Sequence, residues 1–209
     1  MYILYWAQET GAMAPQVLLE EVGVEYQRVI IDMEKGEEMQ ADYLAVNPRG
    51  QIPALFLPDG ALLTESAAMV LHIAERYPES GLLPPPGSVE RAQVYRWLFY
   101  AVANIYEADL RLYYSERFAT EADCADSIKN KASEDMNSAW ELLEQQLGDG
   151  PYLLGEQYSV IDPYLLMLAY WHQQPQELLA RCPKSKRLCD TVQQRPAVQR
   201  IWLQHFSVE

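Results

Sequence analysis

The sequence predicts a two-part fold, in which an α/β unit with a mixed four-stranded sheet precedes an all-α helical half. Strand patterns occur only in the early part of the chain, prolines and glycines are concentrated over residues 78–88, and long helical patterns follow. These observations divide the chain into a first domain at 1–77, a linker at 78–88 and an all-helical domain at 89–209.

The elements of the first domain are expected in the order βαβαββα. Runs rich in apolar and β-branched residues predict strands at 2–6, 26–31, 53–57 and 61–63. A helix with Pro15 in its first turn and a stop at Gly23 joins the first two strands, and a connection of this length predicts a parallel pair. The turn at 58–60 predicts an antiparallel pair. A short helix over 39–44 and a longer one from about 64 to 77, with Thr64 or Ser66 as its cap, complete the domain.

The helical domain is expected to open with one long helix over about 89–118. Its apolar residues form two stripes, which predict two packed faces. The first stripe contains Val94, Trp97, Leu98, Ala101, Ile105, Ala108 and Leu112, and the second contains Tyr95, Phe99, Val102, Tyr106 and Tyr113. Further helices are expected up to 148 and at 163–172, 176–181, 184–194 and 197–206, with capping boxes from Thr120 to Asp123 and from Ser159 to Asp162.

The chain is strongly acidic, with 30 Asp and Glu against 16 Lys and Arg and a formal net charge of −14. Nucleic acid and anionic membrane surfaces are therefore poor partners, because both repel an acidic protein. No apolar run approaches the roughly 18 residues of a membrane span, and the N-terminus lacks the basic start of a signal peptide. We expect a cytoplasmic protein without nucleic-acid or membrane partners.

No pattern typical of a metal or nucleotide site occurs in the sequence. The three cysteines and three histidines stand apart, without C-x-x-C or H-E-x-x-H spacing. Neither a P-loop nor a G-x-G-x-x-G fingerprint is present. We expect no metal ion and no disulfide framework.

Residues 47–55, N-P-R-G-Q-I-P-A-L, form a polar turn that enters the third strand. One interpretation is a tight connection in which Gly50 supplies a positive φ. The other is a ligand site, because Pro53 at the strand entry turns the carbonyl and amide of Ile52 outward, where a peptide-like ligand can pair with them. The residues alone leave both interpretations open.

The chain resembles the glutathione transferase family. The resemblance rests on the order of elements, the N-P-x-G-x-[IV]-P motif at strand three, the pair Glu65-Ser66 one hairpin later, the proline-rich hinge and the all-helical second half. It covers the whole chain, and the Ser159 to Asp162 box also fits it. It implies a thioredoxin-like first domain, glutathione as co-substrate without a metal, a cytoplasmic homodimer and a role in detoxification.

By position, the resemblance assigns the glutathione site to Gln51, Ile52, Pro53, Glu65, Ser66 and, more weakly, Lys35. Ile52 would offer its backbone to the cysteinyl part of glutathione, presented by a cis Pro53. Glu65 would pair with the ligand's ammonium group, and Ser66, in the first turn of a helix, would bind a carboxylate. Plain helix capping is the alternative role of Glu65 and Ser66.

The residue that activates the glutathione thiol has two candidates. The hydroxyl of Thr10 falls where serine-type members of the family place theirs, and Tyr5 stands near the end of strand one, as in tyrosine-type members. Their alternative roles are a turn residue for Thr10 and a core aromatic for Tyr5. The chain has no cysteine in its first domain, which disfavours a mixed-disulfide mechanism. A free thiol has a pKa of about 8.5, so activation must lower it.

The resemblance implies attack of the bound thiolate on a small hydrophobic electrophile. Its pocket would be lined by Trp6, Met13, Tyr106, Tyr113 and Tyr114, whose alternative role is ordinary interdomain core. Two rival functions remain at this point. One is a glutathione-dependent peroxidase or isomerase, and the other is a non-catalytic binding or regulatory protein of the same fold.

Overall fold

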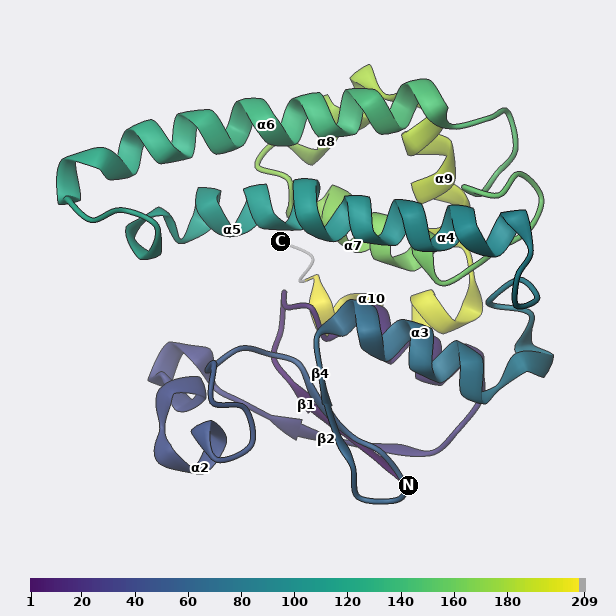
Figure 1. The fold of residues 1–209 in the computed structure, drawn as a ribbon, viewed down its shortest axis with the longest axis horizontal. Helices are drawn as coiled ribbons and strands as arrows, with labels where there is room; N and C mark the ends of the chain where they lie inside the picture. Colours follow the sequence, from purple (N-terminus) through teal and green to yellow (C-terminus); the bar gives the residue numbers. More distant parts are fainter. Residues whose placement is uncertain (207–209) are drawn as a thin grey trace. The chain divides into compact units, whose positions relative to one another are not determined.

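The computed structural model describes residues 1–206, which form two compact units (Figure 1). The first unit comprises residues 1–83 together with the C-terminal segment from 193, and the second comprises 84–192. All residues after 88 were expected in the helical domain, whereas the structure groups the C-terminal helix with the sheet. Residues 207–209 of that expected domain lie outside the described range.

The first unit is built on a four-stranded sheet of order β2-β1-β3-β4. Its strands are β1 (Tyr2–Trp6), β2 (Tyr26–Ile30), β3 (Ala54–Phe56) and β4 (Leu62–Thr64). β1 pairs parallel with β2 and antiparallel with β3, and β3 pairs antiparallel with β4. The expected mixed sheet and both expected pairings are confirmed. β3 begins one residue later than expected, after Pro53, which has no N–H to donate.

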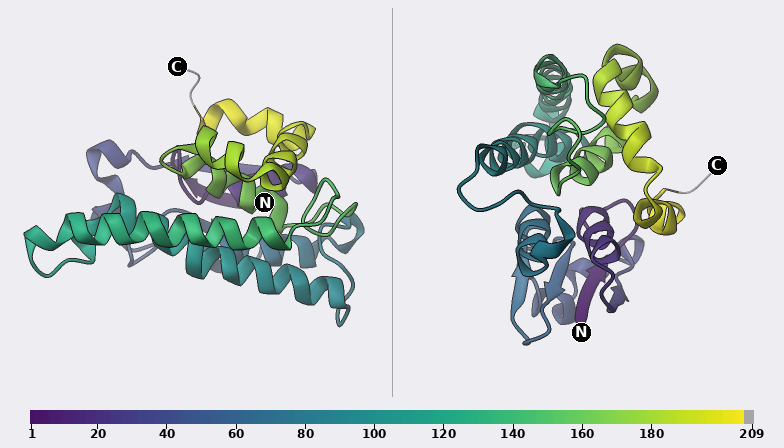
Figure 2. Two further views of the ribbon diagram at one scale, coloured as in Figure 1. Left: turned by 90° about the horizontal axis from the view of Figure 1, so that it is seen from above. Right: turned by 90° about the vertical axis from the view of Figure 1, so that its right-hand side faces the viewer.

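The helices of the first unit are α1 (Met13–Glu21), α2 (Ala41–Leu44), α3 (Ser66–Arg76) and α10 (Pro196–His205). α1 packs against α3, and α10 packs against α1 (Figure 2). Short 3-10 turns occupy Met33–Lys35, Glu37–Met39 and Pro78–Ser80. Met39 was expected in the same helix as Tyr43, but it lies in a 3-10 turn and is 61% exposed, while Tyr43 is buried.

The fully buried side chain of Gln16 ties α10 to the sheet. Its Oε1 accepts a hydrogen bond from Trp6 Nε1 at 2.8 Å and lies 2.7 Å from Nε2 of His205. Its Nε2 donates to the Tyr26 hydroxyl and to Gln204 Oε1, both at 3.0 Å. One glutamine therefore connects α1, β1, β2 and α10. Because every polar atom of its amide is engaged, its burial is compensated.

The second unit begins with the helix expected at 89–118, which the structure divides into three parts (Figure 1). They are α4 (Val89–Tyr100), a π-helical segment (Ala101–Tyr106) and α5 (Glu107–Tyr113), followed by a 3-10 turn at Ser115–Arg117. All seven residues of the first apolar stripe are buried, as expected. The second stripe is exposed or half-buried, with Phe99 64% and Tyr113 51% exposed.

The remaining helices are α6 (Ala125–Gln146), α7 (Ile161–Trp171), α8 (Pro175–Arg181) and α9 (Pro183–Gln193), with a 3-10 turn at Ala122–Cys124. α6 runs alongside the π segment and α5 (Figure 1). α7 is buried over nearly its whole length, which confirms it as the centre of this unit. Within residues 1–206, no helix combines the length and the apolar character needed to cross a membrane.

The two expected capping boxes have different outcomes. Asp162 Oδ2 accepts hydrogen bonds from the Ser159 amide at 2.7 Å and from the Ser159 hydroxyl at 3.2 Å, so this box forms. Asp162 Oδ1 also accepts from the Leu153 amide at 2.8 Å, which anchors the preceding loop. The box from Thr120 to Asp123 is wrong, because α6 begins after Cys124 without a side-chain cap.

We predict that His205 makes the stability of the protein depend on pH. Burial, with the nearby charge of Arg28, lowers the pKa of His205 to about 3. An unfolded histidine titrates near pH 6.5, so the unfolded state binds the extra proton below that pH and stability falls as the pH falls. This group should reduce the free energy of unfolding by about 1.4 kcal/mol between pH 7.5 and pH 5.5, as measured by urea unfolding.

The matched variant is His205→Gln, which keeps a polar side chain but does not titrate. Its stability curve should be flatter over this pH range, with only the smaller contribution of His172, whose pKa burial also lowers. Equal slopes for the variant and the natural protein would contradict the prediction.

Candidate functional site

The register of the sheet brings three separate segments together at one end of its central strands. Tyr5 pairs with Ala54, and Ala54 pairs with Thr64. Extended by one residue, the same register sets Pro53 opposite Trp6 on one side and opposite Glu65 on the other. The end of β1, the start of β3 and the start of α3 therefore meet where β3 begins.

The carbonyl of Gln51 is held by two donors just before β3. Its oxygen accepts from the Tyr43 hydroxyl and from Asn47 Nδ2, both at 2.6 Å. Burial raises the pKa of Tyr43 to about 12, so its hydroxyl remains a donor at neutral pH. Asn47 is itself buried, and its Oδ1 accepts from the Arg49 amide at 3.2 Å. This arrangement fixes the backbone on one side of Ile52.

The backbone of Ile52 has no hydrogen-bond partner among the described residues, at either its N–H or its C=O. The Ile52–Pro53 peptide bond is cis, as the resemblance implied. Backbone groups of folded proteins are almost always paired with protein or water. A residue left unpaired beside a fixed carbonyl can pair with the main chain of a peptide-like ligand.

Gly50 has the positive φ that was expected of it, +60°. A Cβ atom at this position would lie 2.6 Å from Met39 Sδ and 3.1 Å from the Glu38 carbonyl oxygen. The turn before β3 therefore requires glycine for both its backbone conformation and its packing. This supports the tight-connection interpretation of 47–55 without opposing the ligand-site interpretation.

Glu65 and Ser66 stand at the N-terminus of α3. Ser66 is the first residue of the helix and is 6% exposed. Glu65 occupies the N-cap position with φ +66° and ψ +104°, and its side chain makes no capping hydrogen bond. Its carboxylate lies 3.3 Å from Arg49 Nη1, and both side chains are largely exposed. Thr64 or Ser66 was expected as the cap, so this expectation is wrong, and capping does not explain the carboxylate of Glu65.

The two activator candidates lie in different surroundings. The Thr10 hydroxyl, in the loop between β1 and α1, donates to the Ala7 carbonyl at 2.8 Å and accepts weakly from the Ala12 amide at 3.4 Å. The Tyr5 ring packs within 5.6 Å of Tyr43 and 6.0 Å of Phe56. Each candidate therefore fills its alternative structural role, which leaves its catalytic role a prediction.

Lys35 lies in the 3-10 turn after β2 and forms an exposed ion pair with Asp32 at 2.5 Å. The Asp32 carboxylate raises the pKa of Lys35, chiefly through their hydrogen bond. β1 and β2 are parallel, and Trp6 at the end of β1 pairs with Ile30 at the end of β2. The turn that contains Lys35 follows β2, so it lies at the same end of the sheet as Trp6. Its assignment to a ligand site stays a prediction.

The residues expected to line an electrophile pocket divide between the two units. Trp6 and Met13 of the first unit are 7% and 0% exposed. The Trp6 indole donates to both Gln16 and His205, so it acts as a core residue within that unit. Tyr106, Tyr113 and Tyr114 belong to the second unit, where the Arg117 guanidinium stacks 4.0 Å from the Tyr114 ring. Their role as pocket residues stays a prediction.

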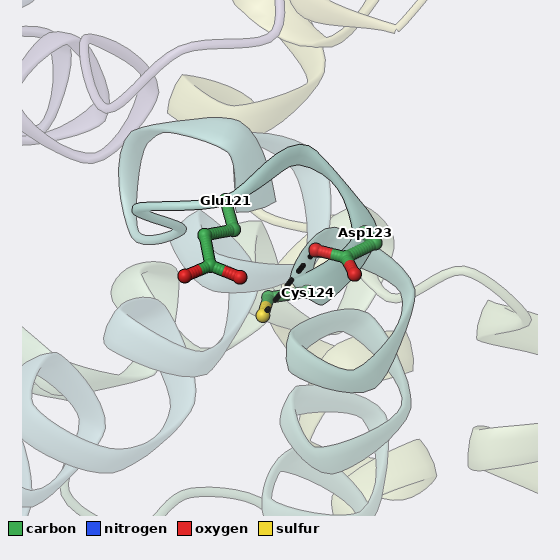
Figure 3. A group of neighbouring side chains, drawn as sticks. All are labelled: Glu121, Asp123 and Cys124. Atoms are coloured by element: carbon green, nitrogen blue, oxygen red, sulfur yellow. Dashed lines mark hydrogen bonds between the residues drawn. The ribbon is translucent and has the colours of Figure 1, made fainter.

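One group of possible metal ligands occurs in the described part of the chain, formed by Glu121, Asp123 and Cys124 (Figure 3). Their ligand atoms lie within 4.8 Å of one another, and all three residues are exposed. Two exposed carboxylates and a thiol do not form a coherent donor set, because hard oxygen and soft sulfur ligands favour different metals. The group supports no metal-site proposal.

Sequence reasoning missed two residues of this site, Tyr43 and Asn47, and the backbone conformation of Glu65. Tyr43 was read as an apolar helix residue, although its hydroxyl holds Gln51. Asn47 was noted only as part of a motif, and its amide holds the same carbonyl. The local sequence contains no signal for the positive φ of Glu65, because glutamate has no preference for that region. One signal was available: Asn47 precedes Gln51 by four residues in a turn, and an asparagine side chain often bonds to the backbone of its own turn.

Known family models match both parts of the chain. A family model described as "Glutathione S-transferase, N-terminal domain" matches residues 12–76, and one described as "Glutathione S-transferase, C-terminal domain" matches residues 108–204. Together the two models cover most of the chain. Both halves therefore match the same family, in the same order as in the resemblance.

Individual proteins agree with the family models. Glutathione S-transferase GstA of Escherichia coli O157:H7 is 29% identical over 169 residues, which is 80% of this chain and 81% of its own length. Glutathione S-transferase F10 of Arabidopsis thaliana is 33% identical over 151 residues, 70% of this chain and 69% of its own. The crystal structure of a glutathione transferase homolog from Sulfitobacter, with bound glutathione, has a TM-score of 0.90 at 29% identity and covers 98% of both chains.

We predict that Glu65→Gly stabilises the protein. A side chain at φ +66° is strained by about 1–3 kcal/mol, and glycine removes that strain at some cost in unfolded-state entropy. The free energy of unfolding should rise by about 1 kcal/mol in urea denaturation. Glu79→Gly is the matched control, since Glu79 is exposed and has no positive φ, and it should be destabilising. A Glu65→Gly protein no more stable than the control would refute the strain.

Proposed function

The chain belongs to the glutathione S-transferase family, and on this basis we propose that it binds glutathione where β3 begins, at the site described above. We further propose that it activates the glutathione thiol and joins the sulfur to small hydrophobic electrophiles. The Sulfitobacter relative, which contains bound glutathione, supports the choice of ligand.

The observation that carries this proposal is the unpaired backbone of Ile52. Its N–H and C=O lack partners within the described residues, while the adjacent Gln51 carbonyl is held at 2.6 Å by both Tyr43 and Asn47. Glutathione is a tripeptide, so its central cysteinyl residue carries one N–H and one C=O of its own. Two antiparallel hydrogen bonds with Ile52 would hold the cysteinyl residue and orient its sulfur.

The N-terminus of α3 suits the γ-glutamyl end of the ligand. Its first amides and the positive end of its dipole attract the α-carboxylate near Ser66. The Glu65 carboxylate, exposed and paired only weakly with Arg49 at 3.3 Å, is available for the ligand's ammonium group. The strained backbone of Glu65 presents that carboxylate instead of a capping interaction, as strain at functional positions often does.

We assign thiol activation to Thr10, with Tyr5 as the alternative. Thr10 lies in the loop that leads into α1, so the first-turn amides of α1 can add to its effect on a bound thiolate. Its hydroxyl proton is directed to the Ala7 carbonyl at 2.8 Å, and donation to sulfur requires the hydroxyl to rotate away from it. One hydroxyl and a helix N-terminus can lower the thiol pKa by about one to two units.

We assign the electrophile site to the aromatic side chains of the second unit, Tyr106, Tyr113 and Tyr114, and treat the buried Trp6 and Met13 as core.

We also propose a homodimer, supported by the apolar Val89 and Phe99, which are 72% and 64% exposed on α4. Free thiols at all three cysteines fit a reducing compartment, which supports a cytoplasmic location.

A glutathione peroxidase or isomerase, or a non-catalytic binding protein, would share the Ile52 site. Assays with a peroxide, with an isomerisable substrate and with an aryl halide separate these functions from conjugation. Binding without any turnover would favour the non-catalytic alternative.

We predict that glutathione binding depends on Glu65 and orders the backbone of Ile52. Calorimetric titration should give a dissociation constant at least about tenfold weaker for Glu65→Gln, because a charge-assisted hydrogen bond to the ligand is lost. Glu79→Gln, at an exposed glutamate, should bind normally. In hydrogen exchange, the Ile52 amide should become protected when glutathione is added. Absence of binding in the natural protein would overturn the proposed function.

We predict that Thr10→Ala raises the pKa of bound glutathione by about one unit, equivalent to about 1.4 kcal/mol. The pKa is measured from the ultraviolet absorbance of the thiolate as a function of pH. Tyr5→Phe should leave it unchanged, because the Tyr5 ring packs against Tyr43 and Phe56. The opposite pattern would transfer the role to Tyr5.

A further inference from the structure

The loop between β1 and α1, residues 7–12, is closed by a hydrogen bond between its two flanks. Trp6 is the last residue of β1, and its Nε1 donates to Oε1 of Gln16, in the first turn of α1, at 2.8 Å. Both side chains are buried, so this bond is shielded from water. Residues 7–12 are named the Thr10 loop, after the residue to which thiol activation is assigned.

Within the Thr10 loop, Thr10 is tied to both flanks. Its hydroxyl donates to the Ala7 carbonyl at 2.8 Å, and its carbonyl accepts from the Met13 amide at 3.2 Å. Glu9, the residue before it, has φ +53°, in a region that residues with side chains rarely adopt. Such a conformation persists only where the surrounding structure imposes it. The position of Thr10 therefore depends on how firmly the two flanks of its loop are held.

A third side chain, from the C-terminal helix, contacts both flanks at once. Nε2 of His205, the last residue of α10, lies 2.7 Å from Gln16 Oε1 and 2.9 Å from Trp6 Nε1. The rings of His205 and Trp6 meet edge to face, with their centroids 5.0 Å apart. His205 is fully buried. Because β1, α1 and α10 all belong to the first unit, these contacts are internal to that unit.

Packing alone does not explain a histidine at this position. Its Nδ1 is buried without a hydrogen-bond partner in residues 1–206, which costs free energy. A phenylalanine ring would fill a similar space without that cost, so what distinguishes the imidazole is the contact of its Nε2 with the two flanks. Burial, with the nearby charge of Arg28, lowers the pKa of His205 to about 3. The ring is therefore neutral, and this contact does not change, over the pH range in which a thiol titrates.

We propose that His205 is a positioning residue for thiol activation, which acts by holding the two flanks of the Thr10 loop together. This inference rests on the proposed function, which assigns activation to Thr10. It adds a role for the C-terminal helix α10, to which the proposed function assigns none.

The physical effect is on the geometry of a hydrogen bond to sulfur. A hydroxyl stabilises a thiolate only at short distance and good alignment, and the bond weakens steeply otherwise. The first-turn amides of α1 add to the stabilisation, and Gln16 sets their place relative to the loop. Without the His205 contact the loop can move, so the thiol pKa rises toward its free value of about 8.5.

The binding of glutathione should depend much less on this contact. Ile52 and Glu65, to which binding is assigned, lie on the segments that enter β3 and α3, outside the Thr10 loop. A change at His205 should therefore alter kcat and the thiol pKa while the KM for glutathione stays the same.

The test replaces His205 by Phe, which keeps a flat ring without polar atoms, and by Gln, whose amide supplies an N–H donor. In His205→Phe the pKa of bound glutathione, measured from thiolate absorbance, should rise by about half a unit. Below that pKa, kcat with an aryl halide should fall about threefold, because the thiolate fraction falls by that factor. His205→Gln should restore most of both values.

A second comparison shows whether His205 acts through Thr10. In a Thr10→Ala background, His205→Phe should not raise the thiol pKa further, because effects that depend on one shared interaction are not additive. Arg195→Gln is the matched control. It removes the ion pair of Arg195 with Glu21 at 2.6 Å, which joins α10 to the other end of α1, and should leave the thiol pKa unchanged.

Four outcomes would overturn the inference while the lowered thiol pKa of the natural protein leaves the proposed function intact. They are an unchanged thiol pKa in a folded His205→Phe protein, an equal rise in His205→Gln, an equal rise in Arg195→Gln, and a full additional rise in the Thr10→Ala background. A natural protein that neither binds glutathione nor lowers its thiol pKa would overturn the proposed function as well.

Native-state hydrogen exchange uses the natural protein, so it decides the question even where a variant does not fold. The Met13 amide, which donates to the Thr10 carbonyl, should exchange through the same opening as the amides of α10 when urea is added. If the Met13 amide stays protected in the opening that exposes α10, the loop does not need His205, and the inference is wrong.

Discussion

Two hydrogen bonds to a single carbonyl oxygen, that of Gln51, set the position from which the candidate site is built. Tyr43 supplies one donor and Asn47 the other, both at 2.6 Å. They fix the chain just before Pro53, where β3 begins between β1 and β4. The neighbouring Ile52 backbone is left unpaired, and Glu65 and Ser66 are brought alongside by the register. A peptide can pair with the main chain here, because the Gln51 carbonyl is held and the backbone of Ile52 is unpaired within residues 1–206.

Strained or unpaired backbone groups occur at two positions to which a role is assigned. Glu65 has a positive φ, and the backbone of Ile52 lacks a hydrogen-bond partner among residues 1–206. Other buried polar groups are satisfied, among them the amide of Gln16 and the carboxylate of Asp162. Unsatisfied or strained groups persist in a folded protein only where the surrounding packing compensates for them, and such positions are frequently functional.

Periodicity and turn chemistry allowed most of the fold to be predicted. The strands at β1 and β2, the burial of α7 and the box from Ser159 to Asp162 followed from local patterns of apolar and capping residues. The box at Thr120, the helical position of Met39 and the capping of α3 did not form as expected. Long-range packing overrides the weaker of these local signals.

The order of elements, the expected parallel and antiparallel pairings and the motif at 47–55 could be predicted from the residues, because these features depend on residues close together in the chain. The packing of the folded chain was needed to show that α10 belongs with the sheet, through Gln16 and His205, and that the Tyr43 hydroxyl holds the Gln51 carbonyl. The burial of Asp109 was likewise beyond sequence reasoning. Hydrogen bonds between side chains distant in sequence, and the desolvation that shifts a pKa, depend on which surfaces meet, and no periodicity encodes that.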